Sequence, residues 1–336
     1  MRTLVVSSYP PRHCGIGAYA YAQVERWRER GDDVVVISPP DGDGDVKVRF
    51  DGGRPFRKAA AMGEGFERIV VHFQPSLYYP PRRPVAKVAA SAWLLWLVRR
   101  RRQTKILVHE ADPPIRWRPD YVLLRQAFKR ARLVFHTDAE RLALERRYRI
   151  RARARLIPHT EGIRVRGPAS RAEARRRLGI DGTERLFLCA GFLQPAKGFE
   201  RAVSAFSAAG SPGRLVIVGS VRDRTQANEA YAAGLRDLCR NTEGAQLLEG
   251  YVSDEDFDAW IAAADRLMLP YVASWSSGVL ARARVIGTPA IVSATGGLAE
   301  QAGPDDAVFH DDAELAALLR SPSPTAAPND RVEIHP

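Results

Sequence analysis

Cysteine is scarce in this chain of 336 residues, and the three that occur, Cys14, Cys189 and Cys239, lie far apart. A scattered, odd-numbered set neither builds a disulfide framework nor has the spacing of a metal cluster. Long apolar runs are missing too, since the longest, residues 88–98, is about half of what a transmembrane helix needs. The sequence therefore argues against a disulfide-rich, a cysteine-metal or a membrane-spanning protein.

Targeting signals and nucleic-acid signals are also missing. The chain goes directly into an expected strand at residues 3–8, without the pattern of a signal peptide. It shows no nucleic-acid-binding motif and no basic stripe interleaved with aromatic residues. It has no internal repeat of solenoid period. We therefore expect a reduced, cytoplasmic protein that does not bind nucleic acid.

Acidic residues are few in the first half of the chain. The net charge is +12, but residues 1–160 carry 32 Lys and Arg against 16 Asp and Glu, whereas residues 161–336 carry 19 against 23. Two explanations stay open. The arginines are solvated helix faces of an arginine-rich protein, or the first half faces an anionic partner such as a lipid headgroup or a phosphorylated acceptor. Trp93 and Trp96, beside the basic run 99–102, are the candidate contact with the inner surface of an anionic membrane.

Apolar strand runs that alternate with helices are abundant. In the first half we expect strands at residues 3–8, 33–38, 68–73, 105–109 and 133–136, and helices at 17–30, 85–102, 121–130 and 139–148. The Gly- and Asp-rich residues 41–53 are expected to form a loop. Such alternation predicts a parallel sheet covered on both faces.

The pattern breaks at residues 158–168, and a second strand–helix series follows. A chain of this length exceeds what one hydrophobic core usually serves. The predicted fold class is α/β, with two doubly wound, Rossmann-like domains at residues 1–160 and 161–320. Residues 321–336, rich in Ser and Pro, are expected to be a disordered tail.

Gly15 and Gly17 follow the first expected strand in the spacing G-x-G-x-x-A, ending at Ala20. Six residues separate Ser8 from Gly15, whereas a dinucleotide-binding turn is tight, and the second strand ends in prolines rather than in an acid that could hold ribose. Both details argue against a dehydrogenase. A tight helix start or an approach to a diphosphate are the two explanations left.

The second half carries a longer series of motifs. Its members are Gly191 leading to Lys197 after a strand at 186–190, Gly219 after a strand at 215–218, Gly250 before Tyr251 and Val252, Ser277-Gly278-Val279 at a helix start, Gly287-Thr288-Pro289, and Gly296-Gly297 before Glu300. These motifs sit where strands end and helices begin, where backbone N–H groups can hold a diphosphate.

In order and spacing, this series resembles the donor-binding domain of GT-B-fold glycosyltransferases, most closely the retaining family 4 (glycosyl transferases group 1). The resemblance implies two Rossmann-like domains that face each other across a cleft, with the donor held by the second and the acceptor by the first. It implies a hexosyltransferase-type enzyme of polysaccharide or glycoconjugate biosynthesis. A sugar would move from a nucleotide-diphosphate sugar to a hydroxyl of a glycan, phosphorylated or lipid-linked acceptor, with retention, without a metal and without a further cofactor.

The same resemblance implies roles for single residues. Lys197 would stabilise the leaving diphosphate, and His109 would lie near the transferred sugar. The donor-binding candidates are Gly15, Gly17, Gly191, Gly219, Tyr251, Val252, Ser277, Gly278, Val279, Arg282 and Glu300. The acceptor candidates are His72, Gln74 and Glu110. We interpret His136 and His159 as structural.

Two departures from the family pattern are visible. The family places two glutamates eight positions apart, where this chain has Ser274 and Arg282, and it places an Arg early in the loop that here begins Gly191-Phe192-Leu193. Arg282 cannot accept a hydrogen bond from ribose and is interpreted as a phosphate contact. Two alternatives therefore stay open: a degenerate, non-catalytic GT-B protein that binds a nucleotide or glycan, and a nucleotide-sugar epimerase.

Overall fold

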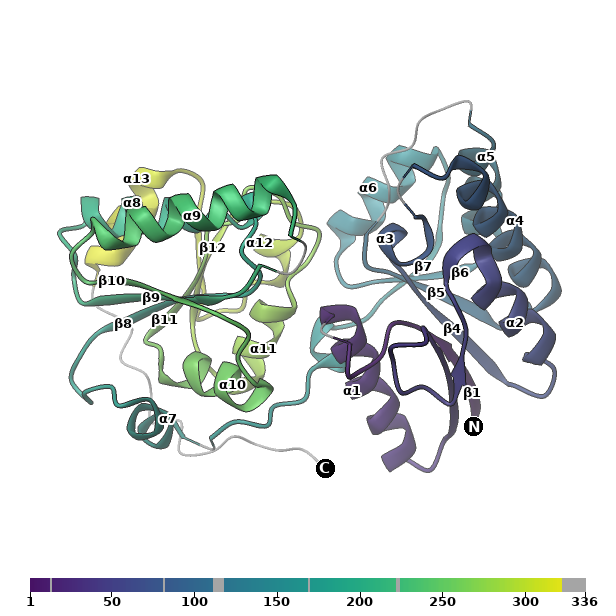
Figure 1. Ribbon diagram of the computed structural model, residues 1–336, viewed down its shortest axis with the longest axis horizontal. Helices are drawn as coiled ribbons and strands as arrows, with labels where there is room; N and C mark the ends of the chain where they lie inside the picture. Colours follow the sequence, from purple (N-terminus) through teal and green to yellow (C-terminus); the bar gives the residue numbers. More distant parts are fainter. Residues whose placement is uncertain (13, 81, 111–117, 169, 222–223, 322–336) are drawn as a thin grey trace. The chain divides into compact units, whose positions relative to one another are not determined.

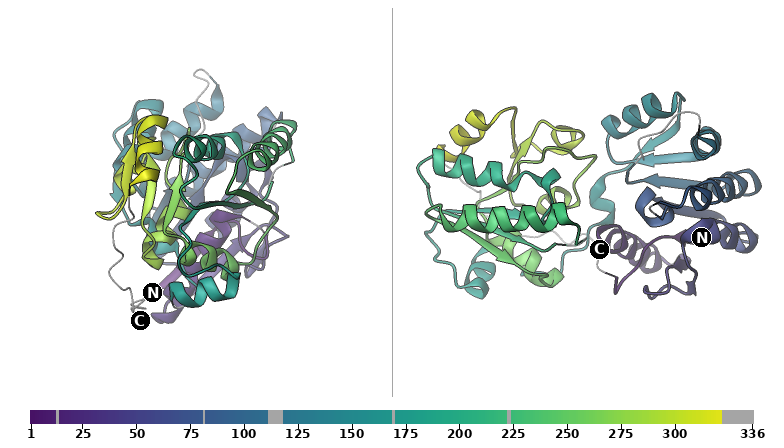
Figure 2. Two further views of the ribbon diagram at one scale, coloured as in Figure 1. Left: turned by 90° about the vertical axis from the view of Figure 1, so that its left-hand side faces the viewer. Right: turned by 45° about the horizontal axis from the view of Figure 1, so that its top comes forward.

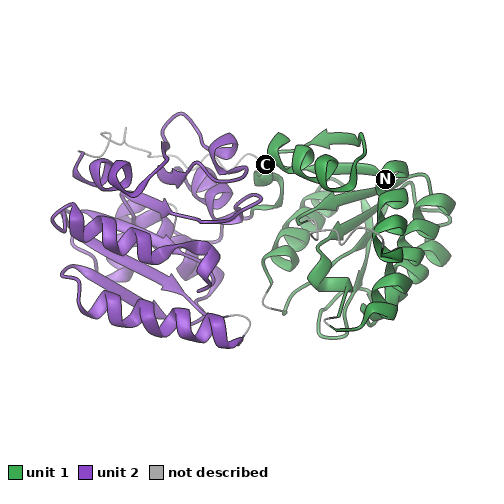
Figure 3. Cartoon of the chain, turned by 90° about the horizontal axis from the view of Figure 1, so that it is seen from above, with its two compact units in different colours: residues 1–163 green, residues 164–336 purple. Residues whose placement is uncertain are grey.

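The computed structural model describes residues 1–12, 14–80, 82–110, 118–168, 170–221 and 224–321. The chain divides into two compact units, Met1–Ile163 and Arg164–Pro336 (Figure 3). The sequence places the boundary between residues 160 and 161. Of the predicted disordered tail, residues 322–336 lie outside the described residues. No helix in the described part of the chain is long and apolar enough to cross a membrane.

The first unit is built on a seven-stranded parallel sheet in the order β3-β2-β1-β4-β5-β6-β7. Its strands are β1 (Arg2–Val6), β2 (Asp33–Ser38), β3 (Val46–Lys47), β4 (Arg68–Phe73), β5 (Thr104–Val108), β6 (Arg132–Phe135) and β7 (Arg153–Leu156). Strands β1, β4, β5 and β6 are almost entirely buried. A parallel sheet buried on both faces requires such continuous apolar runs, as the sequence predicted.

Helices lie on both sides of this sheet (Figure 1). They are α1 (Gly15–Glu29), α2 (Arg54–Met62), α3 (Pro75–Tyr78), α4 (Pro84–Arg100), α5 (Pro119–Arg130) and α6 (Asp138–Tyr148), with 3₁₀ turns η1 (Asp51–Gly53) and η2 (His159–Gly162). A capping box at Thr137 and Glu140 starts α6. The expected loop at residues 41–53 contains the short edge strand β3 and the turn η1, because Val46 pairs with Ile37 of β2.

The second unit repeats the design, with a sheet between helices (Figure 2). Its six parallel strands have the order β10-β9-β8-β11-β12-β13. Its strands are β8 (Leu186–Ala190), β9 (Arg214–Gly219), β10 (Ala245–Glu249), β11 (Arg266–Leu269), β12 (Ala290–Ser293) and β13 (Ala307–Phe309). Its helices are α7 (Arg171–Leu178), α8 (Phe199–Ala208), α9 (Gln226–Arg240), α10 (Asp254–Ala263), α11 (Gly278–Ile286), α12 (Leu298–Gln301) and α13 (Asp312–Arg320), with a 3₁₀ turn η3 (Pro195–Lys197).

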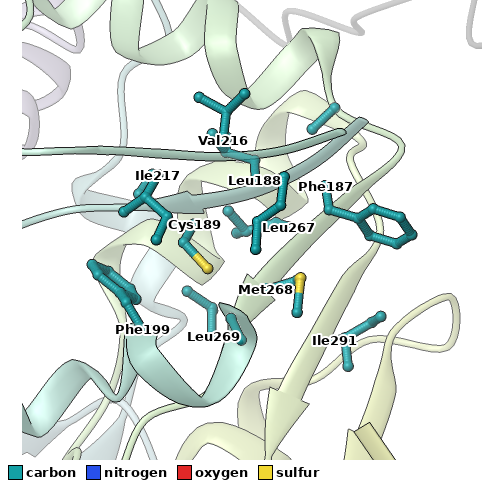
Figure 4. Close-up of a cluster of buried hydrophobic side chains, with 14 of the residues drawn as sticks. Phe187, Leu188, Cys189, Phe199, Val216, Ile217, Leu267, Met268, Leu269 and Ile291 are labelled. Carbon is teal, nitrogen blue, oxygen red and sulfur yellow. The ribbon is translucent and has the colours of Figure 1, made fainter. Parts of the chain in front are cut away.

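The core of the second unit gathers side chains from the middle of its sheet (Figure 4). Leu188 and Cys189 of β8, Ile217 of β9 and Met268 of β11 are completely buried. Burial of apolar area at about 25 cal/mol per Å² makes this cluster the main stabilising contribution to the unit. The same cluster holds the central strands in place, and the loops of the candidate site follow the ends of these strands.

Both sheets have a point where the strand order reverses. In the first unit the chain moves outward from β1 to β3 and then returns to β4 on the other side of β1. In the second unit it moves outward from β8 to β10 and returns to β11. Ligands of open α/β sheets bind outside the carboxyl ends of the strands at such a switch point. The loops after β1 and β4, and those after β8 and β11, are therefore where a site is expected.

Candidate active site

Four sequence-predicted residues come together at the carboxyl edge of the first sheet. His72 ends β4 and His109 follows β5, and His72 Nδ1 lies 3.0 Å from His109 Nε2. One step further out, Gln74 Nε2 donates to Glu110 Oε2 at 3.0 Å. Parallel strands bring their carboxyl ends to the same edge of the sheet. The residues that follow β4 and those that follow β5 therefore lie side by side.

His72 is completely buried, whereas His109, Gln74 and Glu110 are partly exposed. The expectation that His72 lines the acceptor site directly is corrected by this burial, because a side chain without exposed surface cannot touch an acceptor. Its imidazole instead lies behind that of His109. The hydrogen bond with His72 involves Nε2 of His109, so Nδ1 of His109 is the ring nitrogen that His72 does not contact.

His136 and His159, which we interpreted as structural, belong to the same cluster. The ring of Tyr19, from α1, lies with its centroid 5.2–5.8 Å from all four imidazoles. His136 and His159 stack at 4.0 Å, and Gly162 leaves room for the Tyr19 ring, since a Cβ there would lie 2.1 Å from it. The overlooked signal was that His136 follows β6 as His109 follows β5.

All four imidazoles are held neutral. Burial, with His136 nearby, lowers the pKa of His72 to about 3, and burial lowers the pKa of His136 to about 4 despite its contact with the Ile157 carbonyl. Burial and the neighbouring imidazoles lower the pKa of His109 and His159 as well. Within the described residues, no group of three or more His, Cys, Asp or Glu side chains could hold a metal ion.

Gly15 and Gly17 sit at the start of α1, after β1, and differ in what they do there. A Cβ at Gly17 would lie 3.3 Å from Ser8 Oγ and from the Tyr9 amide, so this glycine lets the helix pack tightly on the preceding loop. A Cβ at Gly15 would meet nothing within 4 Å, and its φ is not in the left-handed region. Packing therefore explains Gly17, and the folded chain gives no structural reason for Gly15.

This difference yields a prediction. Gly15→Ala should change the free energy of unfolding by less than about 1 kcal/mol, yet lower turnover if a diphosphate approaches its amide. Gly17→Ala should lose about 1–3 kcal/mol through overpacking. Thermal unfolding and turnover of both variants check this. Equal turnover in wild type and Gly15→Ala would remove Gly15 from the site.

In the second unit, the loop after β8 is shaped by glycines. A Cβ at Gly219, the last residue of β9, would lie 2.1 Å from the Gly191 carbonyl oxygen. Gly191 has a φ of +130° and lies against Val279, with 3.8 Å between its ideal Cβ position and Val279 Cγ2. Both glycines are needed for this close approach. Their contacts bring the carboxyl ends of β8 and β9 to the start of α11.

Lys197 lies at the switch point between β8 and β11. Its ammonium is 3.8 Å from the ring centroid of Tyr271, which follows β11. The Ala196 carbonyl accepts from the Val272 amide at 3.0 Å and fixes the two loops to one another. In the described part of the chain Lys197 forms no ion pair, and it is the single lysine in the sequence of the second unit. A cation held by an aromatic face and not neutralised by a carboxylate is available to an anion.

The start of α11 supplies hydrogen-bond donors beside this loop. Ser277 Oγ accepts from the Leu280 amide at 3.2 Å, and the Ser277 amide donates to Gln301 Oε1 at 2.7 Å. The amides of Gly278 and Val279 have no protein partner among the described residues. Since the Gly191 loop touches Val279, these donors and the positive end of the helix dipole belong to the same edge as Lys197.

The other donor-binding candidates lie around this edge. The Gly250 amide donates to the Gly219 carbonyl at 2.8 Å, which places Tyr251 and Val252 next to the end of β9. Tyr251 is 57% exposed, so its ring is open to a flat partner such as a nucleobase. Glu300 is an exposed residue of α12, the helix whose Gln301 holds Ser277.

Comparison with known proteins shows what the second unit and the fold are similar to. Residues 170–321 match the family described as glycosyl transferases group 1. This match covers most of the second unit. No curated protein matches the sequence of the chain.

Solved structures show that the whole chain has the GT-B fold. Sucrose-phosphate synthase from Thermosynechococcus elongatus aligns with a TM-score of 0.69 and 18% identity, over 94% of this chain and 88% of that one. Anabaena HepE in complex with UDP aligns with a TM-score of 0.70 and 14% identity, over 95% and 89%. The catalytic domain of starch synthase IV from Arabidopsis thaliana, bound to ADP and acarbose, gives 0.64 and 13%, over 94% and 89%.

Arg282 contacts residues of its own unit. Its Nε lies 3.1 Å from Asp258 Oδ1, and its side chain lies near Asp254 and over Phe257 of α10. Asp258 is buried, and its other oxygen accepts from the Arg166 amide at 2.7 Å. Burial raises the pKa of Asp258 in spite of Arg282. The Arg282 guanidinium thus neutralises a buried carboxylate of its own unit, and its contact with a donor phosphate stays a prediction.

A stability prediction follows from this ion pair. Arg282→Ala should destabilise the second unit by about 3 kcal/mol, since it leaves the Asp258 carboxylate buried without a cation. The double variant Arg282→Ala/Asp258→Asn should recover part of this loss, because asparagine can still accept from the Arg166 amide. Denaturant unfolding of both variants measures it. A loss of nucleotide affinity without loss of stability would return Arg282 to the donor site.

Proposed function

We propose that this protein is a glycosyltransferase that moves a hexosyl group from a nucleoside-diphosphate sugar to a hydroxyl acceptor, with retention of configuration and without a metal. The observation that carries the proposal is Lys197, which lies at the β8–β11 switch point of a group 1 domain without an ion-pair partner in the described residues. The amides of Gly278 and Val279, which have no partner among the residues that the structure describes, add donors at the same edge. UDP, UDP-glucose and ADP in the neighbouring structures support a nucleotide-sugar donor.

The chemistry asks for charge stabilisation more than for a nucleophile. As the bond between the anomeric carbon and the diphosphate oxygen breaks, negative charge gathers on the leaving group, and a fixed ammonium with helix-start amides lowers its energy. The acceptor hydroxyl then forms the new bond to the anomeric carbon. In the retaining reaction its proton passes to the departing diphosphate, so no strongly basic side chain is required.

The first unit would supply the acceptor side. His109, Gln74 and Glu110 offer a ring nitrogen, an amide and a carboxylate on one partly exposed edge, which suits the hydroxyls of a glycan. His72 acts as a positioning residue, since its hydrogen bond holds one ring nitrogen of His109 and thereby sets which nitrogen faces the acceptor.

A phosphorylated or lipid-linked acceptor fits the basic first unit. Trp93 and Trp96 form an edge-to-face pair at 5.2 Å on α4, and Arg100 lies over the Trp96 ring. Aromatic rings beside arginines are typical of proteins that rest on an anionic membrane surface. We therefore propose a peripheral contact with the inner membrane surface and a role in polysaccharide or glycoconjugate biosynthesis.

A second candidate is a non-catalytic GT-B protein that binds a nucleotide or glycan. Ser274 and Arg282 stand where the resembling family has its two glutamates, and Arg282 is committed to Asp258. An epimerase on the same fold is less well supported, because it needs acids for proton removal and the carboxylates at this edge are few.

The experiment that separates these functions follows both binding and product. Purified protein is incubated with UDP-, GDP-, ADP- and dTDP-glucose, with and without glycan or lipid-phosphate acceptors. Release of one nucleoside diphosphate that increases with acceptor supports the transferase. A thermal shift with a nucleotide but no release in any mixture supports the non-catalytic binder. Interconversion of the sugar without release of nucleotide would support the epimerase.

A further inference from the structure

A cavity of about 430 Å³ lies in the first unit at the ends of α4 and α5 and the starts of β6 and β7. Apart from Val98, the residues that line it are all cationic: Arg99, Arg102, Lys129, Arg130, Arg132 and Arg153. Since β6 begins at Arg132 and β7 at Arg153, the cavity opens at the amino-terminal edge of the sheet. His109 and His136 lie at the opposite, carboxyl edge, so the cavity is separate from the candidate active site.

These charges are not balanced by ion pairs within the described part of the chain. In the described residues none of the six side chains forms an ion pair, and of the six only Arg130 has a side-chain hydrogen bond to a protein group, to Gln126. Other arginines of the same unit are paired, such as Arg101 with Glu64 and Arg141 with Asp138. Six cations around one hollow without a carboxylate leave a concentrated positive potential that an anion would satisfy.

The strand register strengthens this charge. Lys105 of β5 is the register partner of Arg132, and Arg132 is in turn the partner of Arg153. Like charges directly opposite one another on neighbouring strands are destabilising. A row of three cations therefore lowers the stability of the fold and is not explained by folding alone. The pKa of Lys105 is lowered by burial first and then by Arg68, Arg155 and Arg132, which agrees with the crowding of cations there.

Helix dipoles account for part of the cluster only. Arg99, Lys129 and Arg130 occupy last turns of α4 and α5, where cations favour the helix C-terminus. Arg132 and Arg153 start strands, and Arg102 lies beyond the end of α4, so the dipole argument does not reach them. Half of the cationic lining is therefore left without a structural reason.

We propose that this cavity binds an anion with several phosphate groups. Guanidinium groups present paired N–H donors that match phosphate oxygens, and five of the six cations are arginines. A water molecule occupies about 30 Å³ in the liquid, so a cavity of about 430 Å³ is many times larger than one water molecule. A cavity of this size has room for several phosphate groups rather than for one carboxylate. Two sources supply this chemistry: a free polyphosphorylated molecule, or the headgroup of a phosphorylated lipid, for which the 38% exposed Trp96 on α4 would be a neighbouring contact.

The test compares two double variants of the full chain that lose the same charge. Arg132→Gln/Arg153→Gln removes cations from the cavity, and Lys58→Gln/Arg146→Gln removes two exposed cations of the first unit outside it. Unfolding temperatures establish that both variants fold. Calorimetry measures binding of inorganic tripolyphosphate, and sedimentation measures binding to vesicles of phosphatidylcholine with and without phosphatidylinositol 4-phosphate.

The proposal predicts that the cavity variant loses affinity at least tenfold for one of the two probes, while the outer variant stays near wild type. Loss toward tripolyphosphate assigns a free polyphosphate, and loss only toward the phosphoinositide vesicles assigns a lipid headgroup. Equal losses in both variants, or no binding of either probe by the wild type, would overturn the site. The nucleotide affinity of the second unit is measured in parallel. A result against anion binding in the cavity can then be distinguished from a result against the proposed transferase function.

Discussion

Replacing Lys197 with alanine is expected to lower turnover of the nucleotide sugar by about 10²–10³-fold, the effect of losing one donor to a developing oxyanion. The ammonium rests on the Tyr271 ring, and the cation–π contact stabilises its position without neutralising it. Its whole charge is then available to the leaving diphosphate. Because the charge develops as the bond breaks, kcat should fall more than KM rises.

Two variants make this result specific. Lys58→Ala removes an exposed lysine of α2 in the other unit and should leave turnover unchanged. Tyr271→Phe keeps the aromatic face under the ammonium and should retain most activity, although it removes a buried hydroxyl that has no partner in the described residues. If Lys197→Ala stayed close to wild type, Lys197 would not belong to the mechanism.

The first unit should lose stability sharply below pH 6.5, and this is the second large effect. His72 and His136 are neutral in the folded protein, with pKa values of about 3 and 4, but titrate near 6.5 when unfolded. Between these values the unfolded chain binds more protons, so stability is complete above pH 6.5 and is lost as pH falls. From pH 7.5 to pH 5, each of the two should cost about 2 kcal/mol.

Calorimetric unfolding between pH 5 and 7.5 measures this loss in the transition of the first unit. His310, 73% exposed in the second unit, serves as the control, and His310→Gln should leave the pH dependence of the first unit as in wild type. His136→Gln should reduce the slope of the unfolding free energy of the first unit against pH by the contribution of one proton, about 1.4 kcal/mol per pH unit. An unchanged first transition at pH 5 would mean that the imidazoles are charged or open to water.

Much of the fold follows from the sequence because its signals are strong and local. Strands such as β4 and β8 are continuous apolar runs, and α6 begins at a recognisable cap, Thr137. Edge strands cannot be predicted in this way. β7 is fully exposed in the sequence Arg-Ala-Arg-Leu, and β3 has only two residues, so neither shows the burial pattern of a strand.

The candidate site was predictable to the extent that it depends on strand ends. His72, Gln74, His109 and Glu110 meet as the topology requires, and Lys197 lies at the switch point. What could not be predicted depends on contacts across the fold. The grouping of His136 and His159 depends on Tyr19, a residue of a helix far away in the sequence, and the role of Arg282 depends on a buried carboxylate one helix before it.

Calorimetric titration shows whether Lys197 and the start of α11 form a nucleotide-sugar site. Wild type, Lys197→Ala and Lys58→Ala are each titrated with UDP, GDP, ADP and dTDP. We expect wild type and Lys58→Ala to bind one nucleotide with the same affinity and Lys197→Ala to bind it at least about tenfold more weakly, a difference of about 1.4 kcal/mol. Equal affinity in all three proteins, or no binding to any nucleotide, would contradict this expectation.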